Sequence, residues 1–292
     1  MDIPYTVGAR PDTGLYNGKL GVWLFLASEV MLFGALFTSY LFVRLGAEDG
    51  TWPAHVLDVR IGLFNTFMLI ISSITMVYAW VALKERNLAK YRVFLAATIL
   101  CALVFLGLKS YEYYSKYIHY GAFIKADAME KYMPQLEKMD AMVNDIPSQQ
   151  TFEIRGHWEN KADPKADYYE IAPDKNFHPI GYVKPKEEGE KGAGEGTAEA
   201  EETIKIAKSD VERFGNLLPA YGTYFAMYFT VTGLHALHII GGIVVMTYFL
   251  TIGSRLYKKN PEQLANRLEV TGIFWHFVDL VWITVFPILY LT

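Results

Sequence analysis

Six ionisable side chains lie within or at the edge of long apolar stretches, and they are the chain's candidates for chemistry. They are Glu29, Glu112, His235, His238, His276 and Asp279. Carboxyl and imidazole groups hold and pass protons, and neutral imidazole is also the commonest protein ligand for metals. A charged side chain at the centre of a bilayer costs about 2.5–3.5 kcal/mol on insertion scales, so such residues usually face a protein interior and have a function.

Glu29 is the most isolated of these groups. From Leu20 to Val43, all residues except Glu29 are apolar, glycine, a small hydroxyl residue or tyrosine. Burial in lipid favours the neutral acid, which can donate a hydrogen bond. Two roles are open for it: a carboxyl group that handles protons, or a structural hydrogen-bond partner for a neighbouring helix.

The histidines and Asp279 form two close pairs. His235 and His238 are three residues apart, as are His276 and Asp279, so each pair shares one face of a helix and can act as a unit. Helix bundles do host metal and haem sites. However, the third histidine lies on another helix and the chain has no Glu-x-x-His motif. We therefore expect the histidines to make hydrogen bonds between helices and to bind no metal.

Five stretches are long and apolar enough to cross a bilayer, which takes about 20 helical residues. They are residues 20–43, 61–83, 93–108, 221–250 and 272–291. The third is the shortest, and we expect Arg92 and Lys109 to extend from its ends towards the headgroups. In the fourth, Gly233, Gly241 and Gly242 predict a face on which another helix packs closely.

The composition agrees with a membrane protein. Of 292 residues, 52% are hydrophobic and 15% are aromatic, which exceeds the content of an average soluble domain. The single cysteine, Cys101, excludes an intrachain disulfide. The sequence has no phosphate-binding loop, nucleophile elbow or CxxC motif, and its polar part is acidic. These features argue against an independent catalyst and against nucleic-acid binding.

Positive charges in the short loops predict the orientation, because cytoplasmic loops carry the excess of Lys and Arg. Ten such residues fall on the side of the N-terminus: Arg10, Lys19, Lys84, Arg86, Lys90, Arg92, Arg255, Lys258, Lys259 and Arg267. The short loop on the other side has only Arg44 and Arg60. We therefore expect the N-terminus inside, the C-terminus outside, and the long segment between the third and fourth spans on the periplasmic side.

That segment divides the chain into residues 1–117 with three spans, an insert at 118–214, and residues 215–292 with two spans. Residues 116–215 hold 14 Lys and Arg against 20 Asp and Glu, so the insert region is acidic. This charge is suited to attracting a basic partner on the external side, although a solvated decoration would have the same composition. We expect His119, His157 and His178 to be surface residues without a metal.

Local patterns predict structure within the insert. Apolar residues at helical spacing predict a short helical cap over 126–145, with Pro134 in the first turn or at a kink. Aromatic residues mixed with Pro and Gly indicate irregular structure or short strands over 151–182. The Glu-, Gly- and Lys-rich residues 185–202 indicate a flexible linker.

Four motifs in the spans resemble those of one family. They are SEVMLF at 28–33, NTF at 65–67 followed by Ser72, Ser73 and Thr75, TGLHALHIIG at 232–241, and WHFVDLVW at 275–282. A weaker fifth is KSYEY at 109–113, where Lys109 replaces the glutamine of many members. The chain resembles subunit III of the haem-copper terminal oxidases in its short bacterial form. The likeness covers about residues 15–117 and 215–292 and leaves out the insert.

The resemblance implies an all-α membrane protein: a bundle of five transmembrane helices in the bacterial cytoplasmic membrane, with a mixed external insert between helices 3 and 4. It implies a non-catalytic core subunit of a proton-pumping cytochrome c oxidase that reduces oxygen. Haem and copper would belong to the partner subunits I and II, and phospholipids would occupy a cleft near Glu29. The acidic insert would be suited to attracting a basic cytochrome c or another periplasmic subunit. The six ionisable residues would tune proton uptake, oxygen access and the integrity of subunit I.

Three other functions are open. Subunit III of a quinol oxidase and an accessory subunit of a nitric oxide reductase have similar motifs. A protein of a different class, an independent five-helix transporter, would use intramembrane Glu and His residues along an ion pathway. The motifs favour the oxidase subunit.

Overall fold

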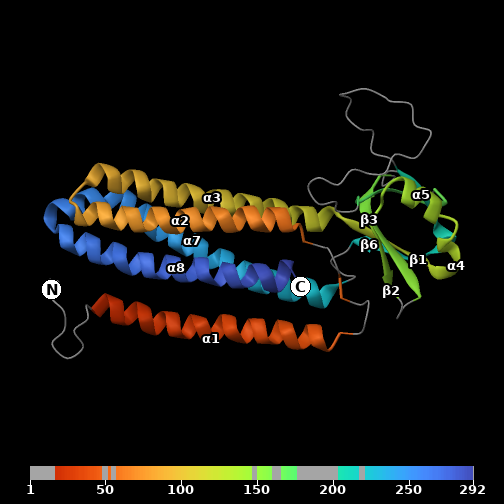
Figure 1. Ribbon diagram of the computed structural model, residues 1–292, viewed down its shortest axis with the longest axis horizontal. Helices are drawn as coiled ribbons and strands as arrows, with labels where there is room; N and C mark the ends of the chain where they lie inside the picture. Colours follow the sequence, from red (N-terminus) through yellow and green to blue (C-terminus); the bar gives the residue numbers. More distant parts are fainter. Residues whose placement is uncertain are drawn as a thin grey trace, which may run out of the picture. The chain divides into compact units, whose positions relative to one another are not determined.

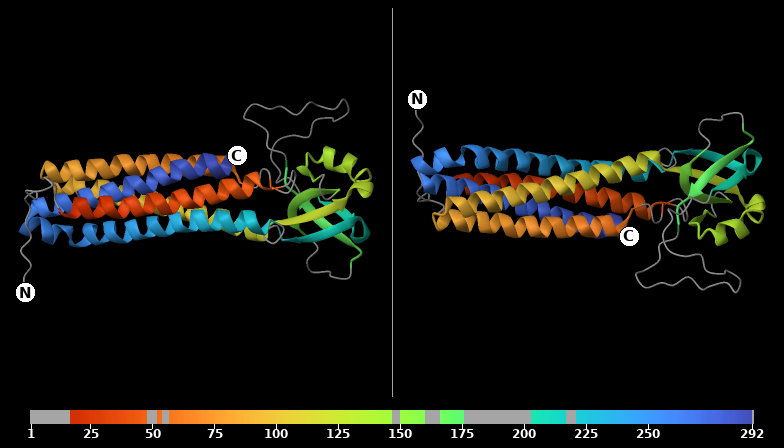
Figure 2. Two further views of the ribbon diagram at one scale, coloured as in Figure 1. Left: turned by 90° about the horizontal axis from the view of Figure 1, so that it is seen from below. Right: turned by 90° about the horizontal axis from the view of Figure 1, so that it is seen from above.

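The computed structural model describes residues 17–47, 52–53, 57–146, 150–159, 166–175, 203–216 and 221–291. The chain divides into two compact units (Figures 1 and 2). One comprises residues 1–46, 55–112 and 223–292, and it is a helical bundle. The other comprises residues 47–54 and 113–222, and it contains a β-sheet. The predicted linker at 185–202 lies outside the described residues.

Five helices of the described chain are long and apolar enough to cross a membrane. They are α1 (Asn17–Leu45), α2 (Val59–Lys84), α3 (Leu88–Ile118), α7 (Gly222–Lys259) and α8 (Pro261–Tyr290). The five predicted spans are confirmed, but most of the helices run well beyond the apolar stretches, above all α3. Hydropathy marks the part of a helix that lipid can cover, whereas the helix itself ends only where a cap or a turn stops it. At the N-terminus of α8 this cap is Asn260. Its side-chain oxygen accepts a hydrogen bond from Gln263 N at 3.1 Å, and Pro261 occupies the first turn.

Helices α2 and α8 pack along most of their length, and polar side chains join them. Trp275 Nε1 donates to Ser72 Oγ at 3.1 Å, and Trp282 Nε1 donates to Thr66 Oγ1 at 3.0 Å. Buried indole N–H groups need such acceptors, because an unpaired polar group is costly in an apolar interior. These two hydrogen bonds fix the rotation of α8 about its axis. They thereby determine which way the other residues of the WHFVDLVW motif point.

Only one of the three predicted packing glycines is in close contact. A Cβ atom on Gly242 would lie 2.7 Å from the ring of Trp275, so glycine is required where α7 meets α8. Gly233 and Gly241 have open space at their Cβ positions. No described helix of this chain approaches those two residues closely, so for them the prediction stays untested, because glycine content alone does not say which face of a helix has a neighbour.

The described part of the insert forms an antiparallel six-stranded sheet with two short helices (Figure 1). Its elements are β1 (Tyr120–Lys125), α4 (Ala126–Met129), α5 (Met133–Lys138), β2 (Val143–Ile146), β3 (Thr151–Trp158), β4 (Tyr168–Pro173), β5 (Ile204–Ala207) and β6 (Val211–Asn216). The strand order is β5-β4-β3-β1-β6, and β2 also pairs with β3. The short strands predicted within 151–182 are confirmed by β3 and β4.

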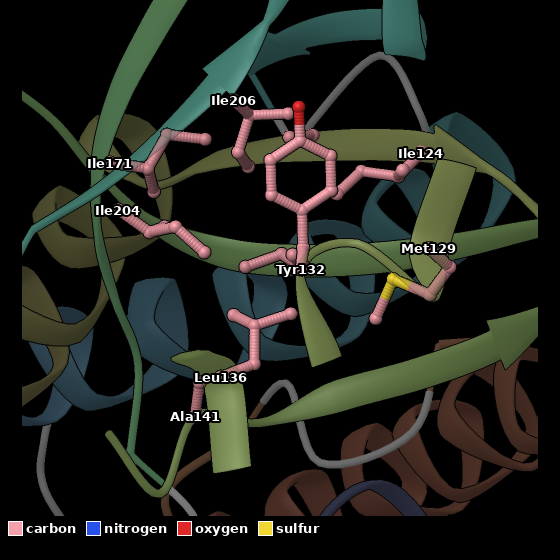
Figure 3. Close-up of a cluster of buried hydrophobic side chains, with 10 residues drawn as sticks. Ile124, Met129, Tyr132, Leu136, Ala141, Ile171, Ile204 and Ile206 are labelled. Atoms are coloured by element: carbon pink, nitrogen blue, oxygen red, sulfur yellow. The ribbon is translucent and has the colours of Figure 1, made fainter. Parts of the chain in front are cut away.

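One face of the sheet carries the core of the insert (Figure 3). Its members include Ile124, Ile154, Ile171, Ile204 and Ile206 from four strands, with Tyr132 and Leu136 from the helical segment. The helical prediction for 126–145 is confirmed over α4 and α5, with Pro134 in the first turn of α5. It is wrong for residues 143–145, which lie in β2 and pair with β3. Four residues are too few for periodicity to distinguish a strand from the end of a helix.

Candidate functional site

Glu29 of α1 and His238 of α7 form a hydrogen-bonded pair within the bundle. His238 Nε2 lies 2.9 Å from Glu29 Oε2, and their side chains are 15% and 13% exposed. The other ring nitrogen, Nδ1, lies 2.8 Å from the carbonyl oxygen of Leu234. Phe33 covers the imidazole, with ring centroids 5.5 Å apart. The pair therefore joins the first and fourth spans in apolar surroundings.

The bond to Leu234 determines how many protons this pair holds. A carbonyl oxygen only accepts hydrogen bonds, so His238 Nδ1 must carry a hydrogen. Nε2 and Glu29 Oε2 then share one further proton, which resides either on the carboxyl group or on the imidazole. Its transfer over 2.9 Å converts a neutral pair into an ion pair without moving a heavy atom. The arrangement can hold one proton between the two side chains.

His276 and Asp279 of α8 face α2. His276 Nδ1 lies 2.6 Å from Ser73 Oγ. Asp279, one turn further along, is buried, and Ser73 lies close to its carboxyl group without meeting the usual hydrogen-bond geometry. All three residues line a hollow of about 240 Å³ whose other walls are apolar side chains of α2 and α8. The hollow has room for water or for a polar group of another chain beside the carboxylate.

His235 is buried among aromatic rings. Its ring centroid lies 5.7 Å from that of Phe105 on α3 and 5.3 Å from that of Trp282 on α8. Within the described chain, neither ring nitrogen has a hydrogen-bond partner. Only His238 is hydrogen-bonded to a neighbouring helix, so the two histidines do not act as a unit despite sharing a helix face. Hydrogen bonds between helices are present for His238 and His276 but not for His235.

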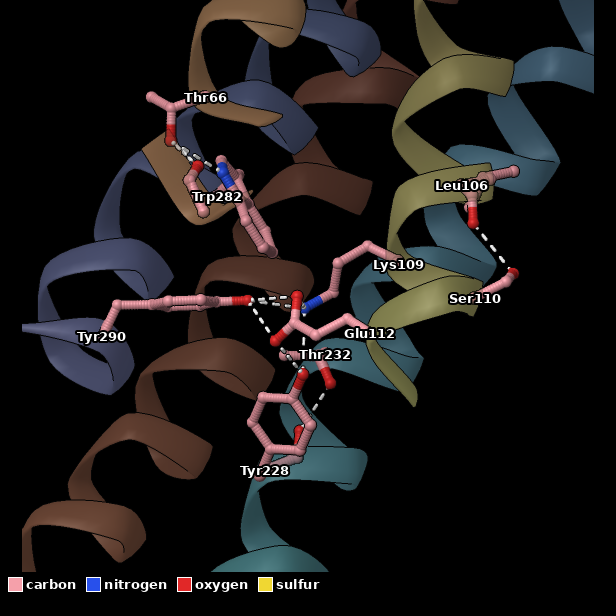
Figure 4. A network of polar contacts seen from close by, with 10 residues as sticks. Thr66, Leu106, Lys109, Ser110, Glu112, Tyr228, Thr232, Trp282 and Tyr290 are labelled. Atoms are coloured by element: carbon pink, nitrogen blue, oxygen red, sulfur yellow. Dashed lines mark hydrogen bonds and ion pairs between the residues drawn. The ribbon is translucent and has the colours of Figure 1, made fainter. Parts of the chain in front are cut away.

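Glu112 belongs to a four-residue network that connects α3, α7 and α8 (Figure 4). Lys109 Nζ donates to Glu112 Oε2 at 3.1 Å, to Tyr228 Oη at 3.1 Å and to Tyr290 Oη at 2.8 Å. Tyr228 Oη donates to Glu112 Oε1 at 2.7 Å, and Tyr290 Oη lies 2.8 Å from both carboxylate oxygens. The side chains of Lys109 and Glu112 are 4% and 2% exposed. Each charge is thus paired and hydrogen-bonded, as burial requires.

The expectation that Lys109 extends towards the headgroups is wrong. Its ammonium group turns inward and lies 5.0 Å from the ring centroid of Trp282. A lysine at the end of an apolar stretch fits either direction, and only the partner helices decide. The spacing of Lys109 and Glu112, three residues apart on one helix, was the available signal for an ion pair. Nothing in the sequence indicated Tyr228 or Tyr290.

A family comparison identifies the bundle. The family model of cytochrome c oxidase subunit III matches residues 11–128 and 216–292. The chain belongs to this family. It is thus a multi-pass membrane protein and a subunit of a haem-copper oxidase, as the resemblance implied. Members of the cytochrome c oxidase subunit III family typically carry no redox centre of their own. The stretch between the two matched segments, residues 129–215, contains most of the sheet unit.

Individual relatives include oxidases with different names. Cytochrome c oxidase subunit 3 of Alkalihalophilus pseudofirmus is 22% identical over 296 residues, covering all of this chain and 96% of the relative. The probable quinol oxidase subunit 3 of Staphylococcus saprophyticus is 22% identical over 288 residues, covering 98% of this chain and 94% of the relative. The heme-copper oxidase subunit I+III of Aeropyrum pernix is 23% identical over 281 residues, covering 94% of this chain but 22% of the relative.

Proposed function

We propose that this chain is the non-catalytic subunit III of a proton-pumping cytochrome c oxidase in a bacterial cytoplasmic membrane. It supports subunit I by stabilising it, by supplying protons to its uptake path and by giving oxygen a lipid-lined approach. The N-terminus lies in the cytoplasm and the insert in the periplasm, in keeping with the ten positive charges on one side of the spans.

The observation that carries this proposal is the pairing of Glu29 with His238. It is a proton-holding group in a chain whose family typically lacks redox centres. Since this chain consumes no protons in a reaction of its own, a stored proton serves a neighbouring subunit. Subunit I is that neighbour in our proposal, because the Aeropyrum pernix relative is named as a fusion of subunits I and III. Phospholipids and subunit II are the other partners that we propose.

A quinol oxidase is the second candidate, because relatives named as probable quinol oxidase subunits cover nearly the whole chain. The electron donor binds elsewhere in the complex, so the bundle residues described above do not distinguish the two donors. We favour cytochrome c, since the Alkalihalophilus pseudofirmus relative aligns over the full chain and the insert region is acidic.

Affinity purification of the tagged chain from its native membranes tests the proposal. The expected result is a complex with haem absorbance that consumes oxygen with reduced cytochrome c and not with a quinol. Recovery of the chain without haem would overturn the assignment to an oxidase complex. If oxygen were consumed with a quinol and not with cytochrome c, quinol would be the electron donor. The assignment to subunit III of an oxidase would then still hold.

A further inference from the structure

Three side chains with metal-binding atoms meet in the insert, outside the bundle. His119 precedes β1, His157 lies near the end of β3, and Asp174 directly follows β4. One potential ligand atom from each lies within 4.8 Å of the other two. The rings of the two histidines have centroids 4.4 Å apart. This cluster belongs to neither the bundle nor the polar residues assigned above.

Strand register explains why these residues converge. Gly156 of β3 pairs with Tyr120 of β1 on one side and with Pro173 of β4 on the other. One step beyond these pairs, His119 stands beside His157, and Asp174 N donates to the carbonyl oxygen of Arg155 at 2.8 Å. Residues opposite one another share a face of the sheet, and residues two apart on a strand share it as well. All three side chains therefore emerge on the face opposite the isoleucine core.

The hydrogen bonds of His119 prepare it as a ligand. Its Nδ1 lies 2.7 Å from the carbonyl oxygen of Ser115, so Nδ1 carries a hydrogen. In neutral imidazole this leaves the lone pair on Nε2, which lies 3.3 Å from Asp174 Oδ1. Histidines that bind metals characteristically donate their second N–H to a carbonyl or carboxylate in this way, because it fixes the tautomer and the ring orientation.

The position of Asp174 is equally well defined. The N–H group of Asp174 donates to Arg155, and its carbonyl oxygen accepts a hydrogen bond from Met142 N at 2.8 Å. The backbone at Asp174 is therefore held on both sides. A lone pair on His119 Nε2 and a carboxylate oxygen at 3.3 Å are both acceptors, and a cation must lie between them. That cation is either a proton on the histidine or a metal ion.

The surroundings are compatible with a metal ion. Arg155, the nearest cation on β3, already donates to Glu153 Oε2 from Nη2 at 2.8 Å and from Nε at 3.0 Å, so its charge is offset. The side chains of His119 and Asp174 are 19% and 33% exposed, which leaves an approach from solvent. Two imidazoles and one carboxylate with an open position form a donor set suited to zinc and other first-row divalent ions.

We propose that His119, His157 and Asp174 bind a divalent transition-metal ion, with Zn²⁺ as the reference ligand and water completing its coordination. The ion joins the start of β1 to the ends of β3 and β4. It is a local clamp of the insert and takes no part in oxygen reduction.

Zinc binding to the full-length chain in detergent tests this proposal. The chain is purified with a tag that lacks histidine, treated with a chelator, and titrated with Zn²⁺ against a chromophoric competitor. We expect one ion per chain and at least about tenfold weaker binding in His157→Ala and Asp174→Asn, given that even outer-shell changes cost about 10–100-fold. His178→Ala is the matched control for adventitious binding and should leave the affinity unchanged.

Hydrogen exchange of the same chain with and without Zn²⁺ provides a second measurement that does not depend on a variant folding. Zn²⁺ should slow exchange in peptides covering residues 119–125, 151–158 and 168–175, and should not do so in Asp174→Asn. Absence of saturable Zn²⁺ binding would leave a proton as the bridging cation and overturn the proposal. Binding that is lost in His178→Ala, or that protects other segments only, would overturn it as well.

Discussion

At the scale of single residues, two pairs of ionisable groups inside this apolar bundle offset one another, whereas the described chain offers no hydrogen-bond partner to His235. Glu29 is matched by His238, and Lys109 is matched by Glu112 with two tyrosine hydroxyl groups around them. A buried charge left alone would cost several kcal/mol, whereas a paired and fully hydrogen-bonded group is nearly neutral in free energy. The two pairs differ in what they can do. The first is a single contact between a carboxyl group and an imidazole, and the second is saturated with hydrogen bonds.

Replacing Glu29 by glutamine should leave the complex assembled and impair proton delivery. The Gln amide has the size of the carboxyl group and can donate to His238 Nε2, so the contact between α1 and α7 persists. It cannot release a proton. We expect slower proton uptake and a several-fold shorter lifetime under continuous turnover, measured with a pH indicator and an oxygen electrode.

His238→Gln should reproduce this effect, because the proton is shared between the two side chains. Ser28→Ala is a suitable control, since the Ser28 hydroxyl bonds only within its own helix, to the carbonyl oxygen of Phe25 at 2.6 Å. Loss of the subunit from the purified complex in Glu29→Gln would point to a structural role. Normal uptake and lifetime would exclude Glu29 from the proton path.

Replacing Lys109 by methionine should destabilise the bundle, because Glu112 would lose its counter-ion in a buried site. Removing one partner of such a pair costs about 3–5 kcal/mol. Glu112→Gln should have a similar effect by leaving the ammonium group uncompensated. The measurement is thermal unfolding of the detergent-solubilised chain.

The double variant Lys109→Met with Glu112→Gln should recover part of the loss, since neither charge then remains. Ser110→Ala, on the exposed side of the same helix, provides the control. If the two single effects simply add in the double variant, the buried ion pair contributes no coupling and our account of the network is wrong.

At the scale of elements, Tyr132 joins the helical cap of the insert to the sheet both by packing and by hydrogen bonds. Tyr132, between α4 and α5, packs in the isoleucine core, and its hydroxyl group donates to Asp210 Oδ2 at 2.7 Å while accepting from Ala207 N at 3.1 Å. Asp210 also accepts from Ser209 Oγ at 2.9 Å and from Lys131 Nζ at 3.1 Å. Carboxylates with several donors are stabilised in the ionised form.

The stability of the insert should therefore fall in acid. The hydrogen bond from Tyr132, followed by those from Ser209 and Lys131, lowers the pKa of Asp210 to about 2. Because this value lies below the ordinary Asp pKa of about 3.9, the folded state gains stability above that value and loses it as the pH falls towards 2. Tyr132→Phe should raise the pKa of Asp210 and shift the acid-induced loss to higher pH, seen as faster hydrogen exchange in residues 203–216.

Tyr169→Phe is the matched control for this change. Tyr169 stacks on Phe214 in the same sheet, with ring centroids 3.9 Å apart. It is not among the side chains that donate a hydrogen bond to Asp210. Its loss of a hydroxyl group should not move the pH dependence. An unchanged acid profile in Tyr132→Phe would mean that Asp210 does not link the cap to the sheet.

At the scale of the whole molecule, the chain combines a family bundle with an acidic sheet unit. The family model skips most of the insert, and the bundle alone contains the six residues that the sequence singled out. The negative charge of the insert region is concentrated in residues 187–202, which hold seven glutamates and one lysine. An acidic segment of this kind attracts basic partners at long range and raises their association rate at low ionic strength.

Replacing the seven glutamates of residues 187–202 by glutamine should weaken the salt dependence of turnover with cytochrome c and leave assembly intact. This change alters none of the described strands of the sheet. The comparison is the apparent KM for cytochrome c at low and high ionic strength. The control is the maximal rate at saturating donor, which should not change. Identical salt dependence in both proteins would show that the insert does not recruit the donor electrostatically.

The sequence by itself determined the five spans, the position of the insert and the family. Lipid imposes long apolar runs, and the motifs around Glu29, His235 and Asp279 lie within those runs, so both are readable without a structure. Part of the insert was also readable, because residues 126–138 follow a helical period and Pro134 begins a turn.

Only the tertiary structure decided which of these groups meet. Glu29 pairs with His238 and not with His235, Lys109 turns inward to two tyrosines, and His119 meets His157 and Asp174 through strand register. Each partner comes from a different helix or strand, and no local spacing relates them. Whether a buried polar group is a ligand, a proton store or a structural bond depends on the partner that the fold places beside it.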